Sequence, residues 1–326
     1  MTTLKCAGIG YAKAQREVKN TDLAQIVDTS DAWIQSRTGI CSRYITETEN
    51  TSDLAVRASL KALEDAKKSS EDIDAILCCT VTADCTTPST ASLIQGKLGC
   101  KKDILAFDIN AACSGFIYGL ITASHLLENY PCILVVASET LSKLIDWSDR
   151  NTCVLFGDGA GAAIVEKGQP ISFYTMGQSD QKGVLWAPSR SLRQPLWQAV
   201  QEVGFLQMQG REVFRFAVRA MQEAIENVLE QEHKSLDDVD LIIPHQANLR
   251  IIQHVAKQLH LPLSKFYLNL EQFGNTSAAS IAIALACAKA EGVLKRGMCI
   301  VCVGFGAGLT SGAISVSYTH LTLPTT

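Results

Sequence analysis

The arrangement of apolar runs along the chain repeats itself, which predicts two similar halves. Asp74 and the apolar run that follows it match Asp240 and the run that follows it, and the run from Ile133 matches the run from Cys299 at the same separation. These runs are short and rich in β-branched residues, which is typical of the buried strands of a sheet. Self-similarity at one fixed separation indicates a duplicated structural unit.

Each predicted half also contains one long stretch without acidic or basic residues, 109–127 in the first half and 272–288 in the second. An alternating pattern that predicts a strand precedes each stretch, at 105–109 and at 266–270. Both stretches are rich in Ala, Gly, Ser and Asn rather than in Leu and Phe, which argues against membrane spans. We therefore expect two helices that are buried on all sides within the core.

Amphipathic patterns at 53–67 and 212–229 predict one helix on the outer surface of each half. Together these elements predict an α/β fold of two duplicated halves, which occupy residues 1–168 and 169–317. The segment 318–326 is rich in Thr and continues no apolar pattern, so we expect a non-native tail there.

The composition excludes several classes of protein. The chain has 326 residues, of which 47% are hydrophobic and 19% are charged, so it can form a large core and is not disordered. Its net charge is −4 and it has no block of basic residues. This balance argues against a nucleic acid or a membrane surface as the main partner.

The twelve cysteines lie mostly within apolar runs, where cysteine behaves as a small hydrophobic residue. A disulfide framework is typical of short secreted chains, and no charged-then-apolar leader follows Met1. We therefore expect a reducing, cytoplasmic location. Cys299 and Cys302 form a Cys-x-x-Cys pair in a predicted strand, where residues three apart point to opposite faces, so we expect no metal site there.

Cys113 differs from the other cysteines in its position. It lies at the junction between a predicted strand and the first charge-free helix, among the small residues of 111–115. The free N–H groups and the positive dipole end of a helix N-terminus favour the thiolate, which is the reactive form of cysteine. Cys113 is therefore a candidate nucleophile, with a buried structural cysteine as the alternative.

Two further positions complete the candidate chemistry. His245 follows the end of an apolar strand, where open α/β sheets place their active sites. Asn275 lies at the start of the second charge-free helix, opposite Cys113 by the repeat, where its amide could donate to an anion or only cap the helix. Glycine-rich segments at 156–161 and 304–308 match no nucleotide-binding motif, and the second could present an N–H group to an oxyanion.

Five motifs, in this order, resemble those of the type III ketoacyl-acyl-carrier-protein synthases, a family of the thiolase superfamily. They are Trp-Ile-Gln-Ser-Arg-Thr-Gly-Ile at 33–40, Ala-Cys-Ser-Gly-Phe at 112–116, Phe-Gly-Asp-Gly-Ala-Gly-Ala at 156–162, Pro-His-Gln-Ala-Asn-Leu-Arg at 244–250 and Gly-Asn-Thr-Ser-Ala-Ala-Ser at 274–280. The resemblance extends to about Val316. It implies a homodimer with the thiolase-like fold, a five-layered α-β-α-β-α sandwich that agrees with the two duplicated halves.

The resemblance also implies the reaction. Cys113 would take the acyl group from an acyl-CoA, after which malonyl-acyl-carrier protein would lose CO₂ and its enolate would attack the acyl group, initiating fatty acid biosynthesis. His245 and Asn275 would donate hydrogen bonds to the thioester oxygen, and backbone N–H groups of Cys113 and 306–307 would hold the oxyanion. Acyl-CoA is a substrate, and no cofactor is implied because the loss of CO₂ drives the condensation.

The binding residues follow from the same resemblance. The contacts to CoA and its pantetheine arm would come from Trp33, Arg37, Thr38, Arg150 and Asn248, with Phe305 beside the malonyl group. Carrier protein is acidic, so basic residues are expected near the entrance, and the matching positions are Arg215, Arg250 and Lys257.

Thr87 departs from the family, many members of which have a bulky aromatic residue there that caps the acyl pocket across the dimer interface. We therefore expect a wider pocket that accepts starters longer or bulkier than acetyl. The alternative function is a specialised polyketide-type starter ketosynthase, or an acyltransferase that uses the same cysteine. A non-catalytic scaffold is disfavoured because Cys113, His245 and Asn275 are all present.

Overall fold

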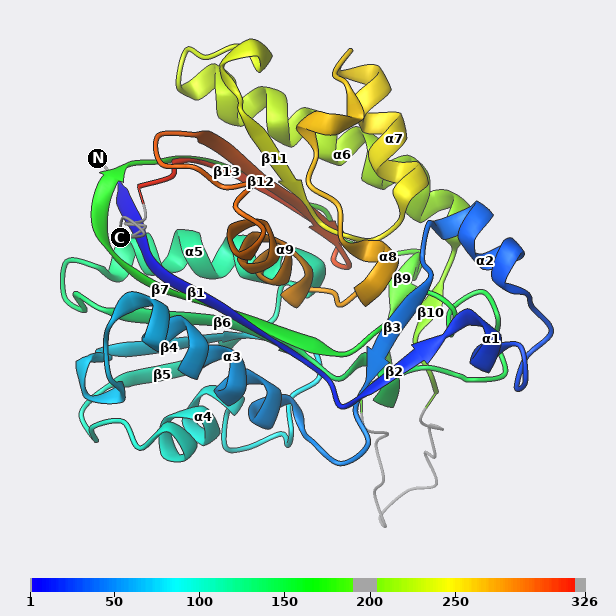
Figure 1. Cartoon of the computed structure of the whole chain (residues 1–326), viewed down its shortest axis with the longest axis horizontal. Coiled ribbons are helices and arrows are strands. Elements are labelled where there is room, and N and C mark those ends of the chain that lie inside the picture. The colour runs from blue at the N-terminus through cyan, green and yellow to red at the C-terminus, as the bar shows by residue number, and fades with distance from the viewer. Residues whose placement is uncertain (1, 190–203, 320–326) are drawn as a thin grey trace.

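Two β-sheets lie on either side of a pair of buried helices in the computed structural model, which describes residues 2–189 and 204–319 (Figure 1). Further helices cover the outer face of each sheet, so the layers alternate helix, sheet, helix, sheet and helix. This order confirms the five-layered architecture predicted from the sequence.

The first sheet has five strands in the order β1-β7-β6-β4-β5, and β4 is parallel to both of its neighbours. Helices α3 and α4 cover its outer face, and α3 buries its apolar stripe against the sheet. The bounds are β1 (Thr3–Lys13), α3 (Thr51–Ala66), β4 (Ala75–Cys79), α4 (Thr90–Leu98), β5 (Leu105–Ile109), β6 (Ile133–Glu139) and β7 (Gly159–Pro170).

The second sheet has four strands in the order β11-β12-β13-β8, and helices α6 and α7 cover its outer face (Figure 1). Strand β11 is parallel to β12, as β4 is to β6, which confirms the repeat of strands predicted from the sequence. The bounds are β8 (Ser172–Gly177), α6 (Gly210–Gln231), β11 (Leu241–Pro244), α7 (Leu249–Gln258), β12 (Cys299–Gly306) and β13 (Thr310–Ser317).

The two charge-free stretches form helices α5 (Gly115–Leu126) and α9 (Ala279–Ala290) between the sheets, as the sequence predicts. Small residues let them pack closely: a Cβ on Gly119 would lie 2.6 Å from the sulfur of Cys79 in β4. The two helices also meet at their N-termini, where a Cβ on Gly115 would lie 3.2 Å from the Cβ of Ala278. The fold therefore brings the segments around Cys113 and Asn275 together.

The prediction of a strand at 266–270 is wrong. A single bridge to β11 forms there, and the chain continues into helix α8 (Leu270–Phe273). The reason is the side chain of Gln246, whose amide nitrogen donates to the Tyr267 carbonyl (3.0 Å) and whose oxygen accepts from the Asn269 N–H (3.1 Å). These hydrogen bonds satisfy backbone groups that a neighbouring strand would otherwise pair.

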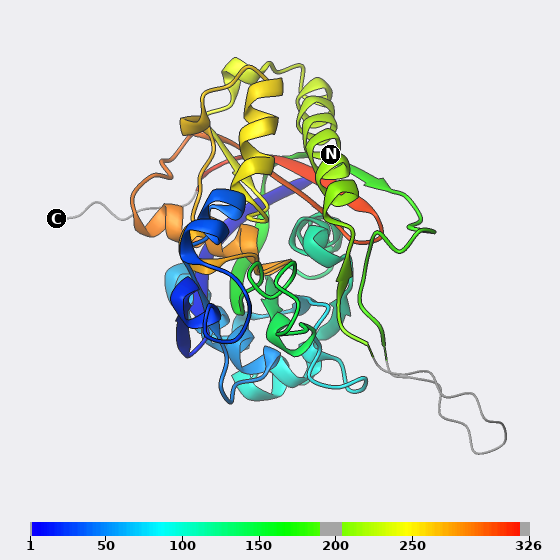
Figure 2. The same cartoon turned by 90° about the vertical axis from the view of Figure 1, so that its right-hand side faces the viewer.

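The remaining elements lie on one side of the molecule. Figure 2 shows helix α2, the segment 140–158 and the β9–β10 ribbon on this side, and the Leu206 N–H donates to the Leu144 carbonyl (2.8 Å) to attach the ribbon. The bounds are β2 (Arg16–Lys19), α1 (Asn20–Leu23), α2 (Asp31–Thr38), β3 (Ser42–Ile45), β9 (Leu185–Trp186) and β10 (Gln207–Met208).

The chain passes from the first sheet to the second at Ile171, close to the predicted division after residue 168. Tyr318, the first residue of the predicted tail, pairs with the core: its N–H donates to the Met298 carbonyl, and its own carbonyl accepts from the Gly297 N–H. The rest of that tail from 320 onward lies outside the described residues. None of the helices within the described ranges has the length and apolar character needed to cross a membrane.

Candidate active site

A cavity of about 1580 Å³ is lined by residues of both halves, including α2, the segment 140–158 and the β9–β10 ribbon. Most of the predicted site residues line it, namely Trp33, Arg37, Thr38, Cys113, Arg150, Arg215, His245, Asn248, Arg250, Asn275 and Phe305. Thr87 and Lys257 do not line it, and both are exposed on the surface of this single chain.

Cys113 lies in a 3₁₀ turn, Ala112–Ser114, that leads directly into α5. Its side chain is 8% exposed, and burial raises the pKa of the thiol to about 12 even though a hydrogen bond with Ser277 lowers it. The expectation that this position favours the thiolate is therefore not supported, because the loss of water around the sulfur outweighs the hydrogen bonds that lower the pKa of the thiol. Ala112 has φ +46°, which is uncommon for a residue with a side chain and places strain next to the sulfur.

The end of strand β12 lies against Cys113. A Cβ on Gly306 would be 2.6 Å from the Cys113 nitrogen and 3.2 Å from its Cβ, so no side chain fits at this position. The backbones of β12 and of the Cys113 turn therefore approach each other closely. This closeness allows N–H groups from both segments to converge on one developing oxyanion.

His245 follows β11 and is buried with its ring against Phe305, at 5.3 Å between the ring centroids. Its Nδ1 lies 2.6 Å from the Ser280 hydroxyl, whereas its Nε2 is buried without a hydrogen-bond partner among the described residues. Burial lowers the pKa of the imidazole to about 3, so the ring is neutral at physiological pH. A buried polar nitrogen with no partner is a group that a substrate can satisfy.

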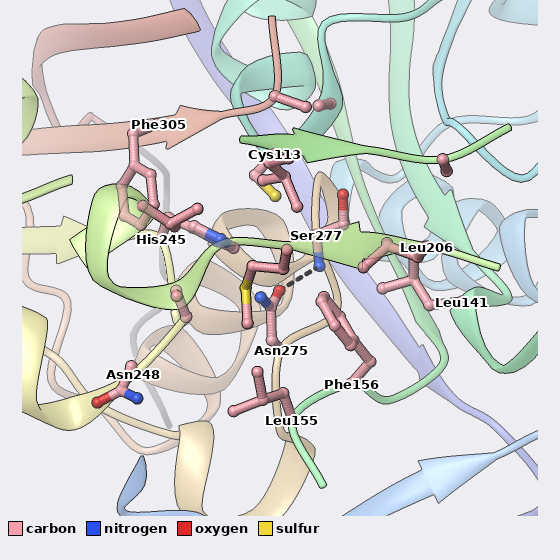
Figure 3. Close-up of a pocket in the computed structure, with 18 of the residues that line it drawn as sticks. Cys113, Leu141, Leu155, Phe156, Leu206, His245, Asn248, Asn275, Ser277 and Phe305 are labelled. Atoms are coloured by element: carbon pink, nitrogen blue, oxygen red, sulfur yellow. Dashed lines mark hydrogen bonds between the residues drawn. The ribbon is translucent and has the colours of Figure 1, made fainter. Parts of the chain in front are cut away.

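Hydrogen bonds fix both the backbone and the side chain of Asn275. Its N–H donates to the Leu155 carbonyl (2.8 Å), and its own carbonyl accepts from the Gly157 N–H (3.0 Å). Its side-chain oxygen accepts from the Ser277 N–H at 2.8 Å, the dashed line in Figure 3. The amide nitrogen is therefore left as the donor, and Figure 3 shows Cys113, His245 and Asn275 around one space.

An aromatic and cationic cluster lies at the cavity surface. The guanidinium carbons of Arg37 and Arg150 are 4.8 and 5.1 Å from the ring centroid of Trp33, and both arginines are exposed. Asn248 donates to the Arg37 carbonyl (3.1 Å) and so connects α7 to α2. A flat ring with cations around it suits a nucleotide, whose base stacks and whose phosphates pair with guanidinium groups.

Thr38 also lines the cavity, but its hydroxyl has structural partners. It donates to the Ile34 carbonyl (2.7 Å) and accepts from the Ile40 N–H (3.0 Å) at the end of α2. Thr38 is 3% exposed, so it shapes the end of this helix more than it offers a free hydroxyl.

Basic residues gather on the rim of the cavity. Arg215 and Arg250 line it and are exposed, as is Arg211, which sequence reasoning missed because an arginine at a helix start resembles an ordinary solvated charge. Asp149 is the one acidic residue among the described lining residues. Lys257 lies on the same helix as Arg250 but outside the cavity. The rim therefore favours anionic groups.

Apolar side chains form the wall of the cavity on the other side of Ser277 from His245. Figure 3 shows Leu141, Phe156 and Leu206 there, and none of the three was given a binding role from the sequence. Leucines in such positions look like ordinary core residues in a sequence, so no local signal separates them. The wall suits the hydrocarbon part of a substrate.

Glu139, at the end of β6, is another residue that sequence reasoning missed. It is fully buried and accepts hydrogen bonds from the hydroxyls of Thr82 (2.6 Å) and Thr80 (3.2 Å). Burial raises the pKa of its carboxyl to about 7, and its charge raises the pKa of Cys113. An acidic residue directly after an apolar strand is the signal that could have identified it.

Comparison with known proteins agrees with this geometry. Family models described as 3-oxoacyl-[acyl-carrier-protein] synthase III and its C-terminal part match residues 107–179 and 229–318. The beta-ketoacyl-[acyl-carrier-protein] synthase III of Clostridium acetobutylicum is 44% identical over 98% of this chain and 100% of its own length.

Solved structures give the same result. The 3-oxoacyl-[acyl-carrier-protein] synthase III of Aquifex aeolicus is 41% identical, with a TM-score of 0.90 over 97% of this chain and 100% of that chain. The priming beta-ketosynthase of the R1128 polyketide pathway is 34% identical, with a TM-score of 0.90 over 98% of this chain and 97% of that chain. The chain belongs to the 3-oxoacyl-[acyl-carrier-protein] synthase III family.

Proposed function

We propose that the chain is an acyltransferase that condenses an acyl-CoA starter with malonyl-acyl-carrier protein, with loss of CO₂, and so initiates fatty acid biosynthesis. The observation that carries this proposal is the meeting of Cys113, His245 and Asn275, from the two halves of the chain, in one cavity. This condensation requires a nucleophile with two neutral hydrogen-bond donors close to it.

Cys113 takes the acyl group in the first step. Its sulfur attacks the thioester carbonyl of acyl-CoA, the bond from that carbon to the CoA sulfur breaks, and the thiol proton leaves on the CoA sulfur. The oxyanion formed on the way accepts hydrogen bonds from the N–H groups of Cys113 and of Gly306–Ala307. The acyl chain lies against Leu141, Phe156 and Leu206.

His245 and Asn275 act in the second step. Both donate hydrogen bonds to the thioester oxygen of malonyl-carrier protein, which stabilises the enolate that forms as the carboxylate leaves as CO₂. The enolate carbon attacks the acyl carbonyl on Cys113, the sulfur departs, and a proton from water restores the thiol. Phe305 lies beside the malonyl group, and the release of CO₂ drives the step without a metal or redox cofactor.

The rim of the cavity binds the carriers of the two substrates. Trp33, Arg37 and Arg150 hold the nucleotide end of CoA, and Asn248 contacts its pantetheine arm, with Thr38 shaping this wall. The acidic carrier protein docks on Arg215 and Arg250 and, farther out on α7, on Lys257.

A homodimer is supported by the free edge of the first sheet. Among the described strands β5 pairs with β4 alone, and its five residues, four of them apolar, are only half-buried in the single chain. Unpaired edges of this kind are sites of strand pairing between chains. The loop that carries Thr87 ends beside β5, where the N–H groups of Thr90 and Ala91 donate to the Asp108 carboxylate (2.7 Å each), so in such a dimer Thr87 would lie close to the partner subunit. A cytoplasmic location would keep the twelve cysteines reduced.

The test is intact-mass spectrometry of the protein after incubation with acetyl, branched and medium-chain acyl-CoAs, followed by addition of malonyl-carrier protein. We expect one acyl group per chain, absent in Cys113→Ala and retained in the control Cys41→Ala, which removes an exposed cysteine outside the cavity. Malonyl-carrier protein should discharge it as a 3-oxoacyl product.

Other outcomes would identify other functions. Discharge without a 3-oxoacyl product would indicate an acyltransferase or hydrolase, and no acylation by any CoA would contradict the role of Cys113. A strong preference for an unusual starter would favour the polyketide-type role, which the similarity to the R1128 priming enzyme keeps as the second candidate.

A further inference from the structure

The Ser280 hydroxyl is in direct contact with the imidazole of His245. Ser280 lies in the first turn of α9, and its Oγ is 2.6 Å from the His245 Nδ1. Ser280 is 2% exposed and His245 is 1% exposed, so water does not compete for this hydrogen bond. The contact joins two residues from distant parts of the chain, of which His245 lines the cavity and Ser280 lies behind it.

The hydrogen-bond partners of the Ser280 hydroxyl determine where its hydrogen points. The Ser280 oxygen accepts from the Gln246 N–H at 3.4 Å, and the described part of the chain offers its hydroxyl hydrogen no acceptor other than the His245 Nδ1. A buried hydroxyl that fails to donate loses free energy, so the hydrogen is directed at Nδ1. A neutral imidazole carries one N–H, and when Nδ1 accepts, that N–H is on Nε2.

We infer that Ser280 is a positioning residue that fixes the tautomer of His245, with Nδ1 as acceptor and Nε2–H as the donor that faces the cavity. This inference rests on the proposed function, in which His245 donates to the thioester oxygen. The buried Nε2 has no partner of its own, so it is available for that oxygen. The opposite tautomer would direct a lone pair at the developing enolate and would repel it.

The arrangement has a counterpart at the second donor. The Ser277 N–H donates to the side-chain oxygen of Asn275 (2.8 Å), so the amide nitrogen of Asn275 remains as a donor for the substrate. Two positions at the start of one helix, Ser277 and Ser280, thus orient both donors toward the same space. Ser280 acts through its side chain, so its role can be tested by substitution.

The inference is tested with Ser280→Ala and Ser280→Thr in the full-length protein. Ser280→Ala is expected to lower the rate of decarboxylative condensation by at least about 10-fold, because a neutral histidine then populates both tautomers, while acylation of Cys113 by acyl-CoA stays within about 3-fold. Ser280→Thr keeps the hydroxyl and should restore most of the condensation rate. The matched control is Ser59→Ala, which removes a buried helix hydroxyl that donates to the Ala55 carbonyl away from the cavity.

A second measurement reads the tautomer without any reaction. In protein labelled with ¹⁵N-histidine, the His245 signals, assigned by their loss in His245→Asn, should show a protonated Nε2 and an unprotonated Nδ1 in the wild type and a mixture in Ser280→Ala. An unprotonated Nε2 in the wild type, or an unchanged tautomer and condensation rate in Ser280→Ala, would overturn the inference. Failure of the wild type to form an acyl-enzyme would instead overturn the proposed function and leave the NMR result standing.

Discussion

The guanidinium of Arg43 donates a hydrogen bond to the Val154 carbonyl, 2.7 Å away, and so joins strand β3 to a segment that lines the cavity. It also donates to the side-chain oxygen of Asn20 (2.7 Å), and Asn20 in turn donates to Asp31, the first residue of α2. Arg43 is fully buried, which lowers its pKa to about 10 and leaves it charged at neutral pH. One buried cation therefore connects α2, which carries Trp33, to the cavity wall.

Substitution of Arg43 by Met should affect both stability and binding of acyl-CoA. It leaves buried acceptors on Asn20 and Val154 without a donor, so we expect the free energy of unfolding to fall by about 2–4 kcal/mol. Loss of the connection to α2 should raise the KM for acyl-CoA several-fold. Urea unfolding and acylation kinetics measure these effects. Arg57→Met, which removes a partly exposed pair with Glu49, should cost at most about 0.5 kcal/mol, and an equal loss in both variants would contradict the argument.

Gly306→Ala should abolish most of the acyl transfer without unfolding the protein. The added Cβ would lie 2.6 Å from the Cys113 nitrogen, so β12 must move away and take its N–H groups out of reach of the oxyanion. We expect the acylation rate to fall by about 100-fold or more, as measured by rapid-quench mass spectrometry. Gly96→Ala in α4, where a Cβ would meet nothing within 4 Å, should leave acylation unchanged and slightly stabilise the helix. Normal acylation in Gly306→Ala would rule out this oxyanion site.

Glu139 makes the stability of the protein depend on pH. Its pKa is about 7 in the folded chain against 4.5 for an ordinary glutamate, so between these values the unfolded chain has lost a proton that the folded chain retains. The contribution of this group to stability is therefore complete below about pH 4.5 and is lost as the pH rises through about 7, since the side that holds more protons is favoured by acid.

Glu139→Gln should remove this dependence. We expect the wild type to lose more of its free energy of unfolding between pH 5 and pH 8 than the variant, and urea midpoints at the two pH values measure the difference. Glu128→Gln, which changes an exposed partner of Lys167, is the control and should behave like the wild type. Parallel pH profiles for all three proteins would show that Glu139 is ionised in the folded chain throughout this range.

Thr87→Phe should narrow the range of starters. In the proposed homodimer, an aromatic side chain here would enter the acyl pocket of the partner subunit and reduce the space for the acyl chain. We expect kcat/KM for branched or medium-chain acyl-CoA to fall by about 10-fold or more, with acetyl-CoA changed by less than about 3-fold. Thr86→Phe, a neighbouring exposed position, is the control. A uniform effect on all starters would place Thr87 outside the acyl pocket.

The sequence was sufficient for features that depend on local pattern. The duplicated strands, the two buried helices and the segments that carry Cys113, His245 and Asn275 are all readable from apolar periodicity and from short strings of residues. They appear in the structure at the predicted places, as the meeting of α5 and α9 beside Cys113 illustrates.

Features that depend on contacts between distant segments could not be read in this way. The strand predicted at 266–270 does not form because the side chain of Gln246 takes the hydrogen bonds of that backbone. No periodic pattern in the sequence indicates such a contact. The sequence indicated that the position of Cys113 favours the thiolate, whereas burial raises the pKa of the thiol, and burial depends on which distant residues pack around the sulfur. The role of Ser280 depends on a distance to His245, which a motif does not contain.

The shared cavity imposes an order of events on the two substrates. The residues proposed for CoA line the same space as Cys113, and so do Arg215 and Arg250, which are proposed for the carrier protein, so the two thioesters must take turns there. Double-reciprocal plots should then give parallel lines, and free CoA should compete with malonyl-carrier protein. The rate of chain initiation would consequently follow the ratio of acylated to free CoA in the cell, a form of feedback that needs no separate regulatory site.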